Sequence, residues 1–289
     1  MNKYLNNKYI YIYMSEPLLV IYSHSQYNDI LIIATKFLKK YKNKILLIDD
    51  NFKNTEYENE YINIIKYDDT KPYGTRLLNL KNITDEVILF MHETDVLIKY
   101  DFNILNNLKK YIIDTKIDKI ELQHCAWPPA KIPLKQTYNM NNKEIYFNEL
   151  CNLYKIDNPD FFVYNVNPTL WRKETLLNIM TQFKDFNYRQ IETKPVQQYT
   201  VSKFNCFSLK CEKYVKCAHF TCPLFFQFIH LTHYGKFAQL KNNFYDNKDY
   251  KYLNNTCLLD EDIYNIYIKE IYEPYIKNLK RPKHNSFPL

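Results

Sequence analysis

Glycine is nearly absent from this chain of 289 residues, which contains only Gly74 and Gly235. The phosphate-binding loop of P-loop enzymes, the dinucleotide-binding fingerprint and the glycine loop of kinases each require glycine at several fixed positions. Two isolated glycines cannot supply these patterns, so nucleotide binding through a glycine-rich loop is excluded. Collagen-like repeats and Gly/Ser linkers are excluded for the same reason.

Long apolar runs and clustered charges are missing as well. Residues 1–16 hold no apolar run of signal-peptide length, and no later stretch approaches the ~20 apolar residues that span a bilayer. The formal net charge is +7, without any block of five like charges. We therefore expect a cytoplasmic protein with no membrane span and no nucleic-acid partner. The excess of Lys, Asn, Ile and Tyr indicates an AT-rich genome, such as that of a large DNA virus, which would place the protein in the host cytoplasm or the virion.

The seven cysteines are an odd number, which favours free thiols in a reducing compartment over a disulfide framework. Four of them lie close together in the sequence with one histidine between them: Cys206, Cys211, Cys217, Cys222 and His219. Their spacing lacks the CxxC pairs of structural zinc sites. Buried thiols are therefore expected here rather than zinc.

Apolar runs alternate with helical periodicity in the first half of the chain. The patterns predict strands at 18–22, 45–48, 61–66, 86–91 and 117–122, and helices at 30–41, 73–82 and 101–113. The second half predicts a Pro-rich loop at 127–135, a strand at 161–164, helices at 171–183 and 192–204, a β-rich stretch at 206–229 and a last helix at 260–278. This order indicates an α/β fold: a mostly parallel central sheet flanked by helices, with C-terminal helical decoration.

Polar residues follow most of the predicted strands of the first half. They are residues 23–25, 49–50, 68–69 and 92–95. Ligands of parallel sheets bind outside the carboxyl ends of the strands. We therefore expect these residues to line one rim of the sheet.

Two acids, Glu93 and Asp95, stand one residue apart at the end of an apolar strand. In an extended chain, residues two apart point to the same face, so both carboxylates can share one divalent cation. Oxygen ligands suit Mg²⁺ or Mn²⁺, and a metal bound this way stabilises the charge of a departing diphosphate. A solvated turn is the alternative interpretation of the same pair.

Several segments resemble, in order, GT-A-type glycosyltransferases of the kind encoded by large DNA viruses and some bacteria. They are VIYSHS at 20–25, YDDTKPYGTRLL at 67–78, HETD at 92–95, NPTLWRKE at 167–174, IETK at 191–194 and YGKF at 234–237. The family pattern has two adjacent acids after the histidine, whereas Thr94 intervenes here. This departure leaves open which acid binds the metal directly, and we favour Asp95 with Glu93 as its helper.

The resemblance implies a single GT-A-like domain over 1–289, with a nucleotide-binding half at about 17–125 and an acceptor and catalytic half at about 126–289. It implies transfer of a sugar from a nucleotide-sugar donor, expected to be UDP-linked, to a hydroxyl of a glycan or glycoprotein. The implied nucleotide contacts are Ser23, His24, Ser25, Asp49, Asp50, Asp69, Arg76 and Thr94. The implied metal ligands are Glu93, Asp95 and His219, with His230 and His233 as alternatives to the histidine. Mn²⁺ or Mg²⁺ is the expected cofactor.

Glu192 is the candidate general base that takes the proton of the acceptor hydroxyl if the transfer is inverting. Trp171 is either a sugar-stacking platform or an apolar anchor of its helix. Two other functions remain open. One is a non-catalytic sugar- or nucleotide-binding protein that keeps the fold, which the altered HETD segment favours. The other is a metal-dependent nucleotidyltransferase, against which the scarcity of glycine argues.

Overall fold

The computed structural model describes residues 16–53, 58–125, 144–148, 151–159, 163–211, 214–218, 220–233, 236–237, 239–242 and 256–279. Its first half contains β1 (Leu18–Tyr22), η1 (Ser25–Tyr27), α1 (Asn28–Phe37), β2 (Lys44–Asp49), η2 (Glu58–Glu60), β3 (Asn63–Tyr67), α2 (Tyr73–Leu77), η3 (Leu78–Asn82), β4 (Val87–His92), β5 (Asp95–Tyr100), α3 (Phe102–Thr115), β6 (Lys119–Glu121) and β7 (His124–Cys125). Strands and helices alternate here as predicted, except that the strands β5 and β7 and the short helices η1 and η2 were not expected.

The second half contains more strands than helices. It comprises β8 (Glu144–Asn148), β9 (Cys151–Ile156), β10 (Thr169–Arg172), α4 (Lys173–Gln182), α5 (Lys194–Lys203), β11 (Cys206–Cys211), β12 (Tyr214–Ala218), β13 (Phe220–Pro223), β14 (Phe226–His230), β15 (Thr232–His233), β16 (Lys236–Phe237), β17 (Gln239–Asn242), β18 (Thr256–Leu259), α6 (Glu261–Ile266) and the π-helix η4 (Tyr267–Ile276). The predicted β-rich stretch and the predicted last helix are both present.

Nine strands form the central sheet, in the order β3-β2-β1-β4-β10-β6-β11-β9-β8. The strands β3, β2, β1 and β4 run parallel to one another, and β11 runs parallel to β6. The other pairings, including β10 with β4 and β8 with β9, are antiparallel. The fold is therefore mixed α/β with a large central sheet flanked by helices. The expectation of a mostly parallel sheet is right for one half of it and wrong for the other, because strands joined by short connections, such as β8 and β9, pair antiparallel.

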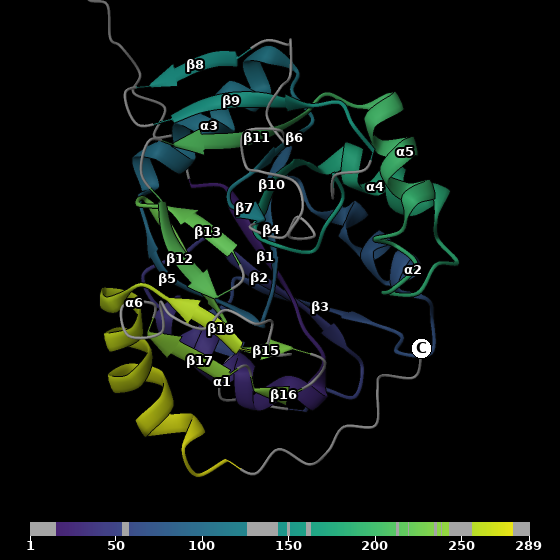
Figure 1. Ribbon diagram of the computed structural model, residues 1–289. Coiled ribbons are helices and arrows are strands. Elements are labelled where there is room, and N and C mark those ends of the chain that lie inside the picture. The colour runs from purple at the N-terminus through teal and green to yellow at the C-terminus, as the bar shows by residue number, and fades with distance from the viewer. Residues whose placement is uncertain are drawn as a thin grey trace, which may run out of the picture.

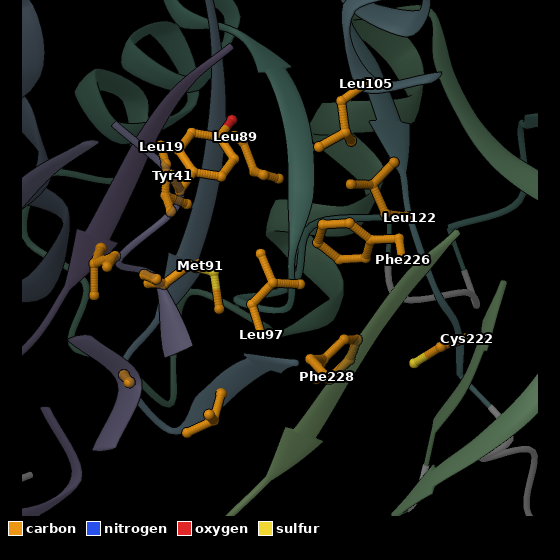
Figure 2. Close-up of a cluster of buried hydrophobic side chains, with 14 of the residues drawn as sticks. Leu19, Tyr41, Leu89, Met91, Leu97, Leu105, Leu122, Cys222, Phe226 and Phe228 are labelled. Carbon is orange, nitrogen blue, oxygen red and sulfur yellow. The ribbon is translucent and has the colours of Figure 1, made fainter. Parts of the chain in front are cut away.

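The two faces of this sheet carry two separate cores. Leu19 and Ile21 of β1 pack with residues of α1, α3 and β14, whereas Val20 and Tyr22 pack with residues of α2 and α4. Figure 1 shows α2, α4 and α5 on one side of the sheet and α1 and α6 on the other. Figure 2 shows part of the first core, to which Leu89 of β4 and Phe226 of β14 both contribute. The alternation of strand side chains thus fixes which helices cover each face.

The structure corrects three predicted elements. Trp171 lies in β10 rather than at the start of a helix, which begins only at Lys173. Val163 and Tyr164 form a bend rather than a strand. Pro195 does not break a helix but stands in the first turn of α5, where its missing N–H has no intrahelical role. The predicted loop at 127–135 lies outside the described residues.

Within the ranges described, no helix combines the length and the apolar character needed to cross a membrane.

Candidate functional site

The ends of the parallel strands meet at one edge of the central sheet. Tyr22 of β1 pairs in register with Leu47 of β2 and His92 of β4, and Asp49 of β2 pairs with Tyr67 of β3. The residues that follow these strand ends are the predicted rim residues. The geometry therefore brings the four predicted segments to a single edge.

Predicted nucleotide contacts form a hydrogen-bonded network at this rim. Ser25 donates to the fully buried carboxylate of Asp49 through its backbone N–H and through its hydroxyl, the latter at 2.9 Å. His24 Nδ1 accepts the N–H of Gln26 at 3.1 Å, which leaves the proton on Nε2, 3.0 Å from Asp69 Oδ2. The imidazole is thereby held between the loops that follow β1 and β3.

Ser23 and Asp50 occupy contrasting positions beside this network. Ser23 is fully buried, its carbonyl accepts the hydroxyl of Tyr67 at 2.8 Å, and its own hydroxyl has no hydrogen-bond partner among the described residues. Asp50 is exposed in the turn after β2. Of these two predicted nucleotide contacts, only Ser23 is buried beside the network, whereas Asp50 faces solvent.

Arg76 ties the loop after β3 to the sheet. Its guanidinium donates to the carbonyls of Asp69 and Lys71, both at 2.7 Å, and lies 3.1 Å from Asp69 Oδ1. It also donates to the Tyr22 hydroxyl at 3.3 Å and lies 5.2 Å from the ring centroid of Tyr67. Arg76 thus positions Asp69, which in turn holds the imidazole at the rim.

Aromatic rings fill the space between this network and the end of β4. The rings of Tyr22 and Tyr67 stack in parallel at 5.3 Å, and Tyr73 packs edge-on against Tyr22 at 5.1 Å. The Tyr73 hydroxyl lies 2.9 Å from Nε2 of His92. Burial lowers the pKa of His92 to about 3, with a smaller contribution from His230. His92 is therefore neutral at physiological pH and adds no positive charge to the site.

Buried Asp95 and partly exposed His230 form an acid–imidazole pair beside these rings. Glu93 and Thr94 make the turn between β4 and β5, and Asp95 begins β5. Its partner strand is β14, where His230 stands opposite Asp95 with Nδ1 2.6 Å from Asp95 Oδ1. Burial raises the pKa of Asp95, and His230 opposes this effect. The histidine that the fold brings to the acids is therefore His230, one of the predicted alternatives, whereas His219 lies outside the described residues.

Thr94 contributes its backbone to this arrangement. Its carbonyl accepts the N–H of Leu231 at 2.9 Å, directly after His230. The Glu93 N–H donates to the carbonyl of Tyr22 at 3.1 Å, and the Glu93 side chain is buried. The turn is thus hydrogen-bonded both to β1 and to the residue after β14. The sequence analysis had instead expected Glu93 and Asp95 to continue the preceding strand in an extended conformation.

Glu192 stands on the turn that precedes α5. Its Oε1 accepts the N–H of Val166 at 3.1 Å. Burial raises the pKa of Glu192 to about 7; the Val166 N–H opposes this effect, and the negative charge of Asp95 adds to it. Tyr188, four residues before Glu192, packs its ring against His92 at the end of β4, which brings the segment of Glu192 to the strand that precedes Asp95. A carboxylate with this pKa can accept a proton near neutral pH.

Tyr188 was missed by the sequence analysis. Its ring packs edge-on against Tyr73 at 5.5 Å and tilted against His92 at 5.6 Å. Although the residue as a whole is 43% exposed, desolvation at its hydroxyl raises the pKa of that group well above the ordinary value, and the charges of Glu192, Asp95 and Glu93 add to this effect. The chain has 28 tyrosines, so residue type gave no signal, and only its place just before the IETK segment could have marked it.

Trp171, by contrast, is not part of the site. It is fully buried in β10, 5.8 Å from the ring of Tyr164 and 5.4 Å from Nζ of Lys119. Of its two predicted roles, sugar platform and apolar anchor, the structure supports the anchor and excludes the platform.

The side chains at the Asp95 position are two carboxylates and one imidazole, which are ligand types that divalent cations accept. Among the described residues no group of three or more His, Cys, Asp or Glu side chains can hold a metal ion. A closed protein cage is therefore not formed by this part of the chain. Mg²⁺, however, is commonly held by one or two carboxylates together with substrate phosphates. Asp95, Glu93 and His230 supply carboxylate and imidazole groups of the types that Mn²⁺ also accepts.

No protein-family model matches this sequence, and no curated protein matches it. Among solved structures, an apo UDP-glucose pyrophosphorylase matches with a TM-score of 0.38 at 8% identity, covering 68% of this chain and 92% of that one. A UDP-glucose pyrophosphorylase complexed with UDP-glucose gives a TM-score of 0.37 at 10% identity over the same shares. Both TM-scores are too low to indicate a shared fold.

Proposed function

We propose that this chain is a metal-dependent glycosyltransferase of the GT-A type, which moves a sugar from a UDP-linked donor to a hydroxyl of a glycan or glycoprotein. The observation that carries the proposal is the Asp95–His230 pair directly after β4, together with Glu192, whose pKa is raised to about 7 by burial and by the negative charge of Asp95. Sugar transfer from a diphosphate requires a proton acceptor and a carboxylate that can bind a cation.

The rim network binds the nucleoside part of the donor in this proposal. Asp49 and Asp69 hold His24 and Ser25 in fixed positions, so the rim presents oriented polar groups to a uracil and a ribose. Arg76 orders the loop that carries Asp69. Ser23, Thr94 and Asp50 remain proposed contacts, of which Asp50 would have to meet the ligand from the exposed turn.

The diphosphate lies toward the end of β4 in this arrangement. Asp95, with help from Glu93 and His230, would hold the Mn²⁺ or Mg²⁺. When bound, the cation supplies charge neutralisation for the leaving diphosphate. The protein's own groups keep the site dry, because Asp95 and Glu93 are at most 4% exposed and neutral His92 lies between aromatic rings.

Glu192 takes the proton of the acceptor hydroxyl as that oxygen attacks the anomeric carbon. The proton moves to the carboxylate, the new C–O bond forms, and the bond between the sugar and the diphosphate breaks. With a pKa of about 7, a large fraction of Glu192 is ionised at neutral pH and its basicity is higher than that of an ordinary carboxylate.

The second candidate is a metal-dependent nucleotidyltransferase, which is the class to which a UDP-glucose pyrophosphorylase belongs. The two reactions break different bonds. A glycosyltransferase releases UDP from a UDP-sugar, whereas a pyrophosphorylase running on pyrophosphate releases UTP and a sugar 1-phosphate. The scarcity of glycine and the single arginine at the described rim favour the first reaction over a site that must cradle a triphosphate.

One experiment separates these functions. Purified protein is incubated with Mn²⁺ and UDP-glucose, UDP-galactose or UDP-N-acetylglucosamine, with a glycan acceptor or with pyrophosphate, and the nucleotide products are separated. We expect UDP, formed only with Mn²⁺ or Mg²⁺. Formation of UTP and sugar 1-phosphate would identify the nucleotidyltransferase. Metal-dependent binding without turnover would favour the non-catalytic binding protein, and no binding of any nucleotide would refute the proposal.

A further inference from the structure

Tyr188 is unusual among the aromatic residues around the site because it is open to solvent. It is 43% exposed, whereas Tyr22, Tyr67 and Tyr73 are 7%, 2% and 3% exposed. Its ring nevertheless has fixed neighbours, since Tyr73 packs against it edge-on and His92 at an angle of 44°. One part of the ring is therefore held by the site while another part faces outward.

The backbone that carries Tyr188 is rigidly mounted. The side chain of Asn187 accepts the N–H groups of Arg189 and Gln190, both at 3.0 Å. The start of α2 binds the same segment, because Gly74 N–H donates to the Phe186 carbonyl at 3.2 Å and Thr75 N–H to the Lys184 carbonyl at 3.0 Å. A ring fixed in this way loses little conformational entropy when a ligand packs on it.

The surroundings of the ring select the chemistry of that ligand. Tyr188 packs on His92, which directly precedes Glu93 in the chain, and Glu192 follows Tyr188 by four residues on the turn before α5. The segments that adjoin the ring therefore carry carboxylate acceptors. A pyranose ring has a face of C–H groups, which suits the electron-rich face of an aromatic ring, and hydroxyls that donate to carboxylates. A nucleobase also stacks on tyrosine, but the rim network that suits a nucleoside lies at the ends of β1, β2 and β3 rather than beside Glu192.

We propose that Tyr188 is the platform on which a pyranose ring packs beside Glu192. The proposal rests on the proposed function and deepens it, because it names a residue that binds a sugar ring rather than the nucleotide. It also assigns to Tyr188 the role that the buried Trp171 cannot fill. The sugar comes from the donor or from the acceptor, and the test has an arm for each source.

The test uses Tyr188→Ala, Tyr188→Phe and, as a matched control, Tyr272→Ala. Tyr272 is also exposed, at 36%, and lies on η4, which packs in the core of the opposite sheet face. Affinities for UDP and for UDP-glucose, UDP-galactose and UDP-N-acetylglucosamine are measured by calorimetry with Mn²⁺, and KM is measured for the acceptor. For Tyr188→Ala we expect unchanged UDP affinity and a three- to tenfold loss, either in UDP-sugar affinity or in acceptor KM. Tyr188→Phe and Tyr272→Ala should behave as wild type.

Two results would overturn the proposal. If Tyr188→Ala loses UDP affinity as much as UDP-sugar affinity, the residue supports the nucleotide or the fold rather than a sugar. If neither UDP-sugar affinity nor acceptor KM changes, no sugar packs on the ring. A protein that binds no nucleotide at all is tested with methyl glycosides by saturation-transfer NMR. If the wild type shows saturation transfer to the glycoside and Tyr188→Ala does not, Tyr188 binds a sugar although the proposed function is wrong. If the wild type shows no saturation transfer, both proposals are refuted.

Discussion

Replacing Glu192 with glutamine removes one ionisable group from the site and keeps an oxygen for the Val166 N–H. Burial raises the pKa of Glu192 from its ordinary value of 4.5 to about 7. Between these two values the folded chain binds a proton that the unfolded chain does not bind. The stability of the wild type therefore falls as pH rises through this window. The difference between 4.5 and about 7 corresponds to a loss of about 3 kcal/mol in the free energy of unfolding of the wild type, and the full loss is reached only above pH 7.

The free energy of unfolding is measured in urea at pH 5 and pH 8 for the wild type and for Glu192→Gln. We expect the variant to be more stable by less than about 1 kcal/mol at pH 5 and by up to about 3 kcal/mol at pH 8. Glu270→Gln, a change at an exposed position of the last helix, is the control. Its stability difference from the wild type should be the same at pH 5 and pH 8. A stability difference between Glu192→Gln and wild type that does not grow with pH would refute the raised pKa.

The same variant tests the chemistry. If the transfer is inverting, kcat falls by roughly 10²–10⁴ while donor affinity stays nearly unchanged, because glutamine cannot take a proton. In the wild type, kcat/KM rises with pH up to about 7 and then levels off. A retaining enzyme would lose little rate, since the departing diphosphate can assist deprotonation. Wild-type kcat together with a product of retained configuration would exclude Glu192 as the base and leave glycosyl transfer intact.

Other substitutions probe the rest of the site. Asp95→Asn should abolish the gain in UDP affinity that Mn²⁺ gives, measured by calorimetry against the exposed control Asp114→Asn; a persistent Mn²⁺ effect would exclude Asp95 as a ligand. Arg76→Lys loses the fork that reaches the Asp69 and Lys71 carbonyls, so UDP affinity should fall about tenfold, and an unchanged Kd would separate the rim from nucleotide binding. Gly74→Ala places a Cβ 2.4 Å from the Phe183 carbonyl oxygen, and we expect a loss of about 1–3 kcal/mol in urea denaturation; wild-type stability would show that the contact relaxes.

The position of the polar residues at one edge of the sheet could be predicted because it depends on short sequence patterns. An uninterrupted apolar run such as 18–22 indicates a buried parallel strand, and the polar residues after it then fall at the ligand edge. The network of His24, Asp49 and Asp69 follows from that rule alone, although its individual hydrogen bonds do not. Arg76 was expected to touch the nucleotide, and its observed contacts with the loop after β3 are a finding of the structure.

What the sequence could not predict depends on contacts between distant segments. The pairing of β5 with β14 selects His230, and no local pattern favours His230 over His233. Trp171 stands directly before the apolar periodicity of α4, so periodicity alone placed it in that helix, although its side chain packs as part of a strand. The position of Tyr188 at the site depends on hydrogen bonds between α2 and the segment after α4, which no local sequence pattern indicates.

The Asp95–His230 contact has a consequence for how the protein matures. The two residues are 135 positions apart, whereas the rim network joins segments that lie within the first third of the chain. Contacts of long sequence separation form late, because a large loop must close before they contribute. During synthesis, the hydrogen-bonded rim network can therefore assemble before the Asp95–His230 pair exists. In the proposed function, a nascent chain would pass through a stage that has the nucleoside contacts but lacks the cation-binding pair, and activity would begin only after β14 has docked on β5.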